Sequence, residues 1–398
     1  MLRRLFTTSR AWTNKEHYLK ANAWHHDPDH VVSTEKRLPK KKVALMLGYN
    51  GSGYQGMQAN PGIRSIEEEV FNALVKTDAI SPSNASDPKK VQLMRAARTD
   101  KGVHAACNLV SLKMICQDEH LVENLNRVLP NHIRIWGYVE TQRTFHAKTK
   151  CDSRVYEYLL PSYTLNAFER KEWTLEPSSD KDYMTRTEHG AVTKYIAPTD
   201  PHVLKAYRVD TPSFDKFKQA MELFQGTHNF HNYTIAKPFA DPSCKRFMMN
   251  ISVDEPMMIE GMEWISVKLH GQSFMLHQIR KMITMAMYSV RTNTPLSFLE
   301  TTFDATKINI PKAPALGLLL DRPVFGLYNE RIKDIPNRSR IDFSLYADAI
   351  TQFKKQYIYK QIFAQEMAEQ TFDRFLASID SHLDTSYGYF SSFKGDTH

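Results

Sequence analysis

The stretch Arg95-Ala96-Ala97-Arg98-Thr99-Asp100-Lys101-Gly102-Val103-His104-Ala105 is the most informative part of this chain. It places one carboxylate, Asp100, among three cations and just before a glycine, where the backbone can turn tightly. Neighbouring cations favour the ionised form of an acid, which is the form that a nucleophile or a general base needs. A surface aspartate in a solvated basic loop would explain the same residues. The rest of the chain therefore has to decide between these two interpretations.

The segments around this stretch predict alternating strands and helices. Val43–Tyr49 is an apolar run that ends with a glycine turn, which is typical of a buried strand. Ile66–Val75 has apolar residues at helical spacing, with Ser65 at the N-cap position and three glutamates in the first turn. Further elements are predicted at 108–114 (strand), 119–129 (helix) and 133–139 (strand). This order indicates one α+β half.

A second half repeats this order. Val155–Leu160 predicts a strand, and Thr211-Pro212 starts a helix that Gly226 stops. Residues 181–210 predict an irregular insertion, and apolar stripes after Arg331 predict a helical extension that packs on the body. Further elements are predicted at 246–253 (strand), 262–269 (strand), 273–290 (helix) and 317–320 (strand).

Four motifs, taken in order, resemble one known family. They are GYNGSGYQGMQ (48–58), RAARTDKGVHA (95–105), FHAK (145–148) followed by CDSRVYEY (151–158), and GQSFMLHQIR (271–280) joined downstream by APALGL (313–318). On these motifs, the chain from about Val43 to Tyr328 resembles the TruA-type tRNA pseudouridine synthases. The third and fourth motifs, with GTHNFHNYT (226–234), are similar to the eukaryotic branch that modifies the anticodon stem.

The resemblance implies an α+β fold in which two ferredoxin-like halves share a central antiparallel sheet, with the active cleft between them. Combined with the patterns above, it predicts four segments. They are a leader at 1–41, an N-terminal half at 42–150 with Asp100, a C-terminal half at 151–330 with Tyr156, Arg280 and Leu318, and a helical extension at 331–398.

The resemblance also implies roles for five residues. Asp100 matches the essential aspartate, which attacks the target nucleotide so that uracil detaches, rotates and rejoins through carbon. Tyr156 matches the tyrosine that stacks on the uracil, Arg280 the arginine that pairs with the aspartate, and Leu318 the apolar residue beneath the base. Arg98 faces the same side as Asp100 if the segment is extended, and it matches the residue that assists base flipping. Core packing alone would also explain a tyrosine at 156 and a leucine at 318.

Five other residues are candidate RNA contacts: Lys101, His104, Lys148, Arg154 and His228. For His104, a buried structural histidine is at least as good an explanation. His228 and His231 have the spacing of a metal-binding pair, but no third ligand is evident nearby. We therefore favour loop packing or RNA contact for this pair and predict no metal site.

The composition is compatible with an RNA partner. The net charge of +8 favours an anionic partner, and nucleic acid is the commonest one. Four cysteines without a Cys-x-x-Cys pair predict ordinary thiols, and the absence of a run of about 18 apolar residues predicts no membrane span. No Gly-Lys-Ser/Thr follows the glycines of 48–58, which disfavours a nucleotide P-loop. No cofactor is predicted, since the isomerisation implied by the resemblance transfers no external group.

The first 15 residues are rich in arginine and hydroxyl side chains and contain no acid, a composition typical of mitochondrial transit peptides. They predict a location in the mitochondrial matrix. A second basic run, KRLPKKK (36–42), makes the nucleus the alternative location.

We therefore expect a pseudouridine synthase that acts on mitochondrial tRNA, at anticodon-stem uridines such as positions 27 and 28. Attack by an aspartate and flipping of the base are the expected mechanism. The alternative is a tRNA-binding folding chaperone without catalytic activity. Bacterial members of the family are dimers, but for this longer chain a monomer is favoured and a homodimer stays open.

Overall fold

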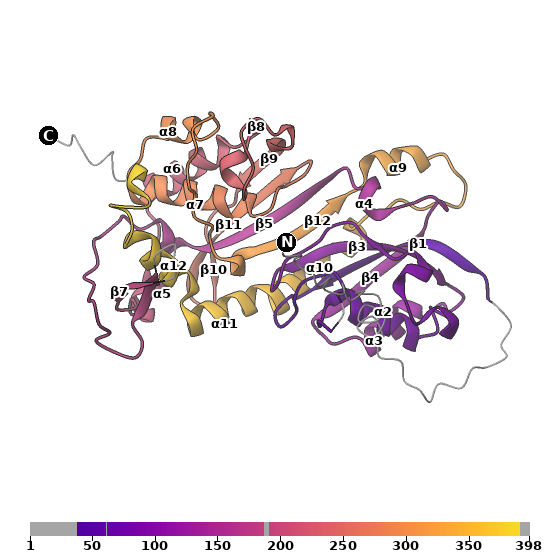
Figure 1. The fold of residues 1–398 in the computed structure, drawn as a ribbon. Helices are drawn as coiled ribbons and strands as arrows, with labels where there is room; N and C mark the ends of the chain where they lie inside the picture. Colours follow the sequence, from indigo (N-terminus) through magenta and orange to yellow (C-terminus); the bar gives the residue numbers. More distant parts are fainter. Residues whose placement is uncertain (1–37, 61, 187–190, 391–398) are drawn as a thin grey trace, which may run out of the picture.

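Figure 1 shows the computed structural model, which describes residues 38–60, 62–186 and 191–390. A ten-stranded sheet runs through it in the order β4-β1-β3-β12-β5-β11-β9-β8, with β2 paired to β3 and β10 paired to β11. Its strands are β1 (Lys40–Tyr49), β2 (Met94–Arg95), β3 (His104–Ile115), β4 (Ile133–Glu140), β5 (Ser153–Pro161), β8 (Gly226–Asn229), β9 (Lys245–Val253), β10 (Met257–Ile259), β11 (Met262–Gly271) and β12 (Leu318–Val324).

The helices pack on both faces and at the ends of this sheet (Figure 1). They are α2 (Ile66–Lys76), α3 (Leu121–Val128), α4 (Ala147–Lys150), α5 (Pro201–Ala206), α6 (Thr211–Glu222), α7 (Gln278–Arg291), α8 (Leu296–Thr301), α9 (Gly326–Ile332), α10 (Ala347–Phe353), α11 (Lys360–Glu369) and α12 (Thr371–Asp380). The α+β class predicted from the sequence is therefore confirmed.

The predicted start of α2 is accurate because local chemistry sets it. The Ser65 side chain accepts a hydrogen bond from the Glu68 amide at the start of α2, and it thereby satisfies one of the free donors of that helix. The apolar stripe of α2 is buried against β1 and β3, as its spacing predicts. This stripe consists of Ile66, Val70, Phe71 and Leu74.

One pairing of the central sheet is parallel, so the expectation of an antiparallel sheet is wrong at that position. Strand β12 pairs with β3 in parallel, with Leu319 opposite His104 and Leu320 opposite Ala105. On its other side, β12 pairs with β5 in antiparallel orientation. Strands β1 to β4 lie on one side of this junction, and β5, β8, β9, β10 and β11 lie on the other. The two parts of the chain thus meet between β3 and β12.

Two other expectations need correction. The insertion predicted to be irregular contains a separate hairpin, β6 (Tyr183–Arg186) with β7 (Val192–Ile196), followed by helix α5. The helix predicted at 273–290 begins only at Gln278, because His277 adopts a left-handed backbone conformation (φ 64°) that interrupts the helix.

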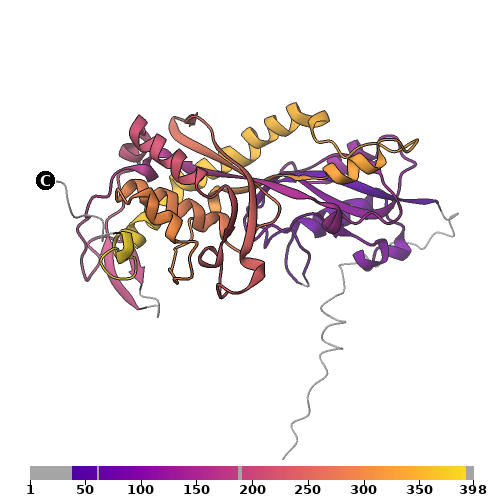
Figure 2. The same cartoon turned by 90° about the horizontal axis from the view of Figure 1, so that it is seen from above.

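The C-terminal extension packs on the body, as predicted. Helix α10, a π-helical turn at Lys354–Tyr359 and helix α11 follow one another and run along one side of the central strands (Figure 2). The Phe353 ring lies edge-on against Trp136 of β4, with 5.3 Å between centroids. The ammonium group of Lys354 contacts both Glu157 of β5 and Asp321 of β12. The end of α10 and the π-helical turn therefore contact strands on both sides of the β3–β12 junction.

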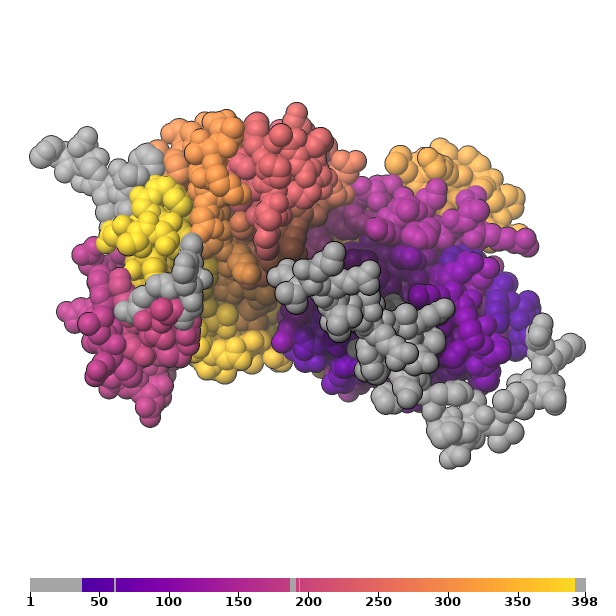
Figure 3. Space-filling view, in the orientation of Figure 1, coloured from indigo at the N-terminus to yellow at the C-terminus, as the bar shows by residue number. Residues whose placement is uncertain are grey.

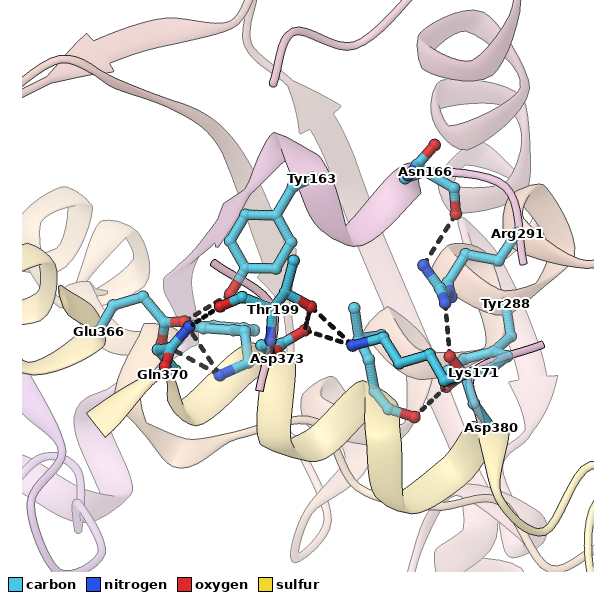
Figure 4. A network of polar contacts seen from close by, with 12 residues as sticks. Tyr163, Asn166, Lys171, Thr199, Tyr288, Arg291, Glu366, Gln370, Asp373 and Asp380 are labelled. Atoms are coloured by element: carbon cyan, nitrogen blue, oxygen red, sulfur yellow. Dashed lines mark hydrogen bonds and ion pairs between the residues drawn. The ribbon is translucent and has the colours of Figure 1, made fainter. Parts of the chain in front are cut away.

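A buried polar network fastens the end of the extension (Figure 4). Asp380 of α12 forms an ion pair with Arg291 (2.7 Å), the last residue of α7, and both side chains are almost fully buried. Glu366 accepts a hydrogen bond from the Tyr163 hydroxyl, and Asp373 accepts one from the Thr199 amide. These contacts link the extension to the segment between β5 and α5.

Candidate active site

The turn between β2 and β3 carries Asp100. Arg98 and Asp100 are exposed, whereas Thr99 between them is buried. The Thr99 hydroxyl shares a hydrogen bond with the Tyr49 hydroxyl (2.8 Å), and the Asn108 amide donates to that Tyr49 oxygen (3.1 Å). These bonds hold the turn from its inner side. Because the side chains alternate between buried and exposed, Arg98 and Asp100 both point to the outer side.

The glycine-rich loop at 50–57 supports this turn. The Met57 amide donates to the Thr99 carbonyl, and the Gly102 amide donates to the Tyr54 carbonyl. A Cβ atom at Gly56 would lie 2.7 Å from the Thr99 carbonyl oxygen, closer than side-chain carbons approach in proteins. The glycine therefore permits a close approach of two backbones. This agrees with the prediction of a tight loop in place of a phosphate-binding one.

Strands β5 and β12 place Tyr156 and Leu318 on the same sheet face, in diagonal positions of adjacent strands. Leu320 lies opposite Tyr156, Leu318 lies opposite Tyr158, and Ala105 of β3 lies opposite Leu320. Directly opposed residues project to the same face of a sheet, so these side chains share one face. Tyr156 is half-buried and Leu318 is partly exposed. In the space-filling view, the surface is hollowed where the red residues of β8 and β9 face the purple N-terminal strands (Figure 3).

The charge of Asp100 acts on residues from two distant parts of the chain. Burial raises the pKa of Tyr156 to about 12, Arg154 lowers it and the Asp100 carboxylate raises it further, so this tyrosine is neutral at physiological pH. Burial lowers the pKa of Arg280, while Tyr158 and Asp100 counteract this effect. The structure thus brings Asp100, Tyr156 and Arg280 within electrostatic reach of one another.

Arg280 does not form a direct ion pair with Asp100, although the resemblance implied that the two are paired. Its Nε–H donates to the carbonyl of Ala313, and the Ala313 amide donates back to the carbonyl of Arg280. This reciprocal pair fixes α7 against the segment that leads into β12. The guanidinium group is half-buried and within electrostatic reach of the Asp100 carboxylate.

The candidate RNA contacts fall into two groups. Lys101 and Lys148 are exposed, and Arg154 is half-buried with one guanidinium nitrogen donating to the Ala96 carbonyl (2.8 Å). By contrast, His104 is 1 % exposed, lies opposite Leu319 on the other face of the sheet, and accepts a hydrogen bond from the Gly51 amide. Its burial lowers its pKa to about 4. This placement favours the structural interpretation of His104.

His228 is engaged in the packing of its own loop. Its ring stacks on Phe303 at 4.2 Å, and its Nε2 atom is hydrogen-bonded to the Gln225 carbonyl (2.8 Å). His231 is buried and packs edge-on against Phe239. In the described ranges, no group of three or more His, Cys, Asp or Glu side chains is arranged to hold a metal ion. The four cysteines form no disulfide.

Sequence reasoning missed three features of this site. Arg95, counted among the cations around Asp100, instead forms a buried ion pair with Glu67 of α2 (2.8 Å). Glu157, beside Tyr156 in sequence, is buried on the back face with Lys354. His277 lies within the influence of Asp100, although it gave no signal beyond its place in a motif. These are contacts between distant segments, which spacing along the chain does not reveal.

The fold and the site define an α+β enzyme class in which the charge of an exposed aspartate reaches a neutral tyrosine of the central sheet and an arginine of helix α7. The sequence profile of the tRNA pseudouridine synthase family matches residues 220–325. The chain is 41% identical to tRNA pseudouridine synthase 1 of Yarrowia lipolytica, over 88% of this chain and 76% of the relative. It is also 41% identical to tRNA pseudouridine synthase 1 of Saccharomyces cerevisiae (87% and 72%) and 34% identical to the pseudouridylate synthase 1 homolog of Mus musculus (93% and 80%).

The chain therefore belongs to the tRNA pseudouridine synthase family of the TruA type. It is an isomerase that converts uridine to pseudouridine in tRNA. None of the helices in the described ranges combines the length and apolar character that crossing a bilayer requires.

Proposed function

We propose that Asp100 is the nucleophile of this isomerisation. The observation that supports this most directly is the convergence of Asp100, Tyr156 and Arg280, since the charge of the exposed carboxylate reaches both other side chains. The carboxylate attacks the target nucleotide, the bond from uracil nitrogen to the sugar breaks, and the uracil rotates. A ring carbon then joins the sugar and the bond to the carboxylate breaks. That carbon loses its proton and the freed ring nitrogen takes one up, so that RNA of unchanged mass is produced.

The other side chains hold the base during this rotation. Tyr156 is neutral and half-buried, so its ring is suited to stacking on a uracil that has left the helix. Leu318 extends the same sheet face as an apolar surface beneath the base. Arg98, on the same side of its turn as Asp100, occupies the space that the flipped base leaves in the stem. Arg280 stabilises the ionised carboxylate through its charge.

Exposed lysines beside this site make the phosphate contacts of the RNA. Lys101 follows Asp100 directly, and Lys148 is exposed at the start of the segment that leads into β5. Arg154 and His228 are further candidates, although both side chains already have partners within the protein. The uridines converted are those of the anticodon stem, at positions such as 27 and 28, a proposal that the motif wording supports.

The remaining proposals concern the protein as a whole. We place it in the mitochondrial matrix on the composition of its first 15 residues, which lie outside the described residues, with the nucleus as the alternative. We propose that it works as a monomer and that its two parts are ferredoxin-like units. The segments 42–150 and 151–330 are their proposed bounds, flanked by the leader at 1–41 and the extension at 331–398.

Tritium release from C5-labelled uridine in tRNA tests the catalytic proposal. The wild-type protein should release tritium, and Asp100→Asn should bind tRNA equally well but release none. A matched control, Asp180→Asn just before β6, should retain catalysis because it removes an exposed carboxylate that is not part of the proposed site. Release by Asp100→Asn at the wild-type rate would reject Asp100. If neither protein releases tritium while both bind tRNA, the chaperone alternative holds.

A further inference from the structure

The turn between β11 and α7 forms one wall of the proposed site. Phe274 of this turn packs edge-on against Tyr156, with 5.1 Å between ring centroids. The turn is closed by reciprocal bonds, since the Gln278 amide donates to the Met275 carbonyl and the Met275 amide donates to the Gln278 side chain. His277 lies within this turn, three residues before Arg280. Its position is therefore tied to both predicted partners of Asp100.

The backbone of His277 is in a conformation that histidine rarely adopts. Its φ is 64° and its ψ is 4°, which is the left-handed region where glycine and asparagine are usual. It occupies the N-cap position of α7, and its carbonyl accepts the first helical bond from the Lys281 amide. Its side chain makes no capping hydrogen bond. Helix capping therefore does not explain a histidine here, and residues held in such conformations gather at functional sites.

The imidazole also lacks the internal bonds expected of a structural histidine. The residue is half-buried, and its Nδ1 atom is buried without a hydrogen-bond partner in the described structure. A buried polar atom without a partner destabilises the fold, so such atoms are rare unless a ligand engages the group. The Nε2 atom of His104 and both ring nitrogens of His231 are buried without a partner as well, so this observation supports a role for His277 only together with its backbone and its place in the turn beside Tyr156.

Burial and the surrounding cations favour the neutral form of the His277 ring. Burial lowers the pKa of His277, Lys312, Arg280 and Lys281 lower it further, and only Asp100 raises it. A neutral imidazole has one nitrogen that donates and one that accepts. It therefore suits a neutral partner that offers both, such as a ribose hydroxyl or the edge of a uracil.

We propose that His277 is a further substrate-contacting residue, whose imidazole hydrogen-bonds a neutral polar group of the target nucleotide beside Asp100. The proposal rests on the proposed function, because it assigns His277 to the same reaction. It explains together the left-handed backbone, the missing cap and the unpartnered nitrogen.

A glycine substitution separates this role from a structural one. Glycine adopts the left-handed conformation readily, so His277→Gly should melt at the wild-type temperature or above it. Its kcat/KM for tRNA should nevertheless fall at least tenfold. His277→Asn, which tolerates the same backbone and keeps a donor and an acceptor, should lose less. Asp78→Gly is the matched control, since exposed Asp78 has φ 55° at the end of α2 and its variant should keep full activity.

Two results would overturn the inference. One is wild-type kcat and KM in His277→Gly. The other is a loss of activity that accompanies a lower melting temperature in both His277 variants, because that pattern indicates a structural role. Asp100→Asn is measured alongside and separates this inference from the proposed function. If it stays active, the assignment of the whole site fails, whereas an inactive Asp100→Asn beside a fully active His277→Gly rejects His277 alone.

Discussion

Lys354, the first residue of the π-helical turn between α10 and α11, forms a buried ion pair with Glu157. Glu157 follows the proposed base-stacking Tyr156 in β5. The same ammonium lies 3.0 Å from Asp321, at the irregularity where β12 shifts its register against β5. The Tyr359 hydroxyl and the Ser266 hydroxyl donate to the other oxygen of Glu157. One cation from the extension is thus shared by two carboxylates directly behind the strands of the site.

Removing this cation should destabilise the protein strongly. Lys354→Met leaves buried Glu157 without a counter-ion, while Asp321 keeps only its ion pair with Arg322. Breaking a buried pair in this way costs about 3–5 kcal/mol. Lys354→Arg keeps the charge and should lose less. Urea denaturation measures the unfolding free energy. Lys355→Met, at the exposed neighbouring position, is the control and should change it by less than about 0.5 kcal/mol. Equal stability of the Lys354 and Lys355 variants would contradict this account.

The free energy of unfolding should fall as the pH rises from about 4.5 to 7 because of Glu366. Burial raises the pKa of its carboxyl group from 4.5 to about 7 in the folded protein. The unfolded chain thus releases this proton at lower pH than the folded chain, which favours unfolding as the pH rises. The total effect is on the order of 3 kcal/mol. Glu366→Gln should remove this part of the pH dependence in urea titrations, whereas exposed Glu369→Gln should leave it unchanged.

Tyr156 should contribute mainly through its ring. Stacking on a base is worth about 1–3 kcal/mol, so Tyr156→Ala should lower kcat/KM by about five- to 150-fold. Tyr156→Phe keeps the ring and should retain more of this activity. Pseudouridine formation under multiple-turnover conditions measures both variants, with melting temperatures to confirm folding. Equal losses in the two variants would instead assign the contribution to the hydroxyl group.

The parts of this fold that were predictable are those set by local chemistry. The N-cap at Ser65 and the apolar stripe of α2 follow from neighbouring residues, and both were predicted correctly. The parallel pairing of β12 with β3 depends on segments more than 200 residues apart, and no local pattern encodes it. The motifs identified Asp100, Tyr156 and Arg280 as candidates. They did not show that Arg95 forms an ion pair with Glu67, because that ion pair joins strand β2 to helix α2.

The hydroxyl of Tyr49 should be needed to hold the Asp100 turn. It connects the Asn108 amide to the Thr99 hydroxyl inside the protein, and Tyr49 is fully buried. Tyr49→Phe keeps the ring but leaves the Thr99 hydroxyl without its partner and the Asn108 side-chain amide with only the Ala97 carbonyl, which costs about 1–3 kcal/mol. Because Thr99 precedes Asp100, the loosened turn should lower kcat more than it raises KM. Tritium-release kinetics measure this, with Tyr138→Phe as the control, since half-buried Tyr138 on β4 has no contact with the turn. Unchanged kcat in a destabilised Tyr49→Phe would show that the hydroxyl supports the fold but does not position Asp100.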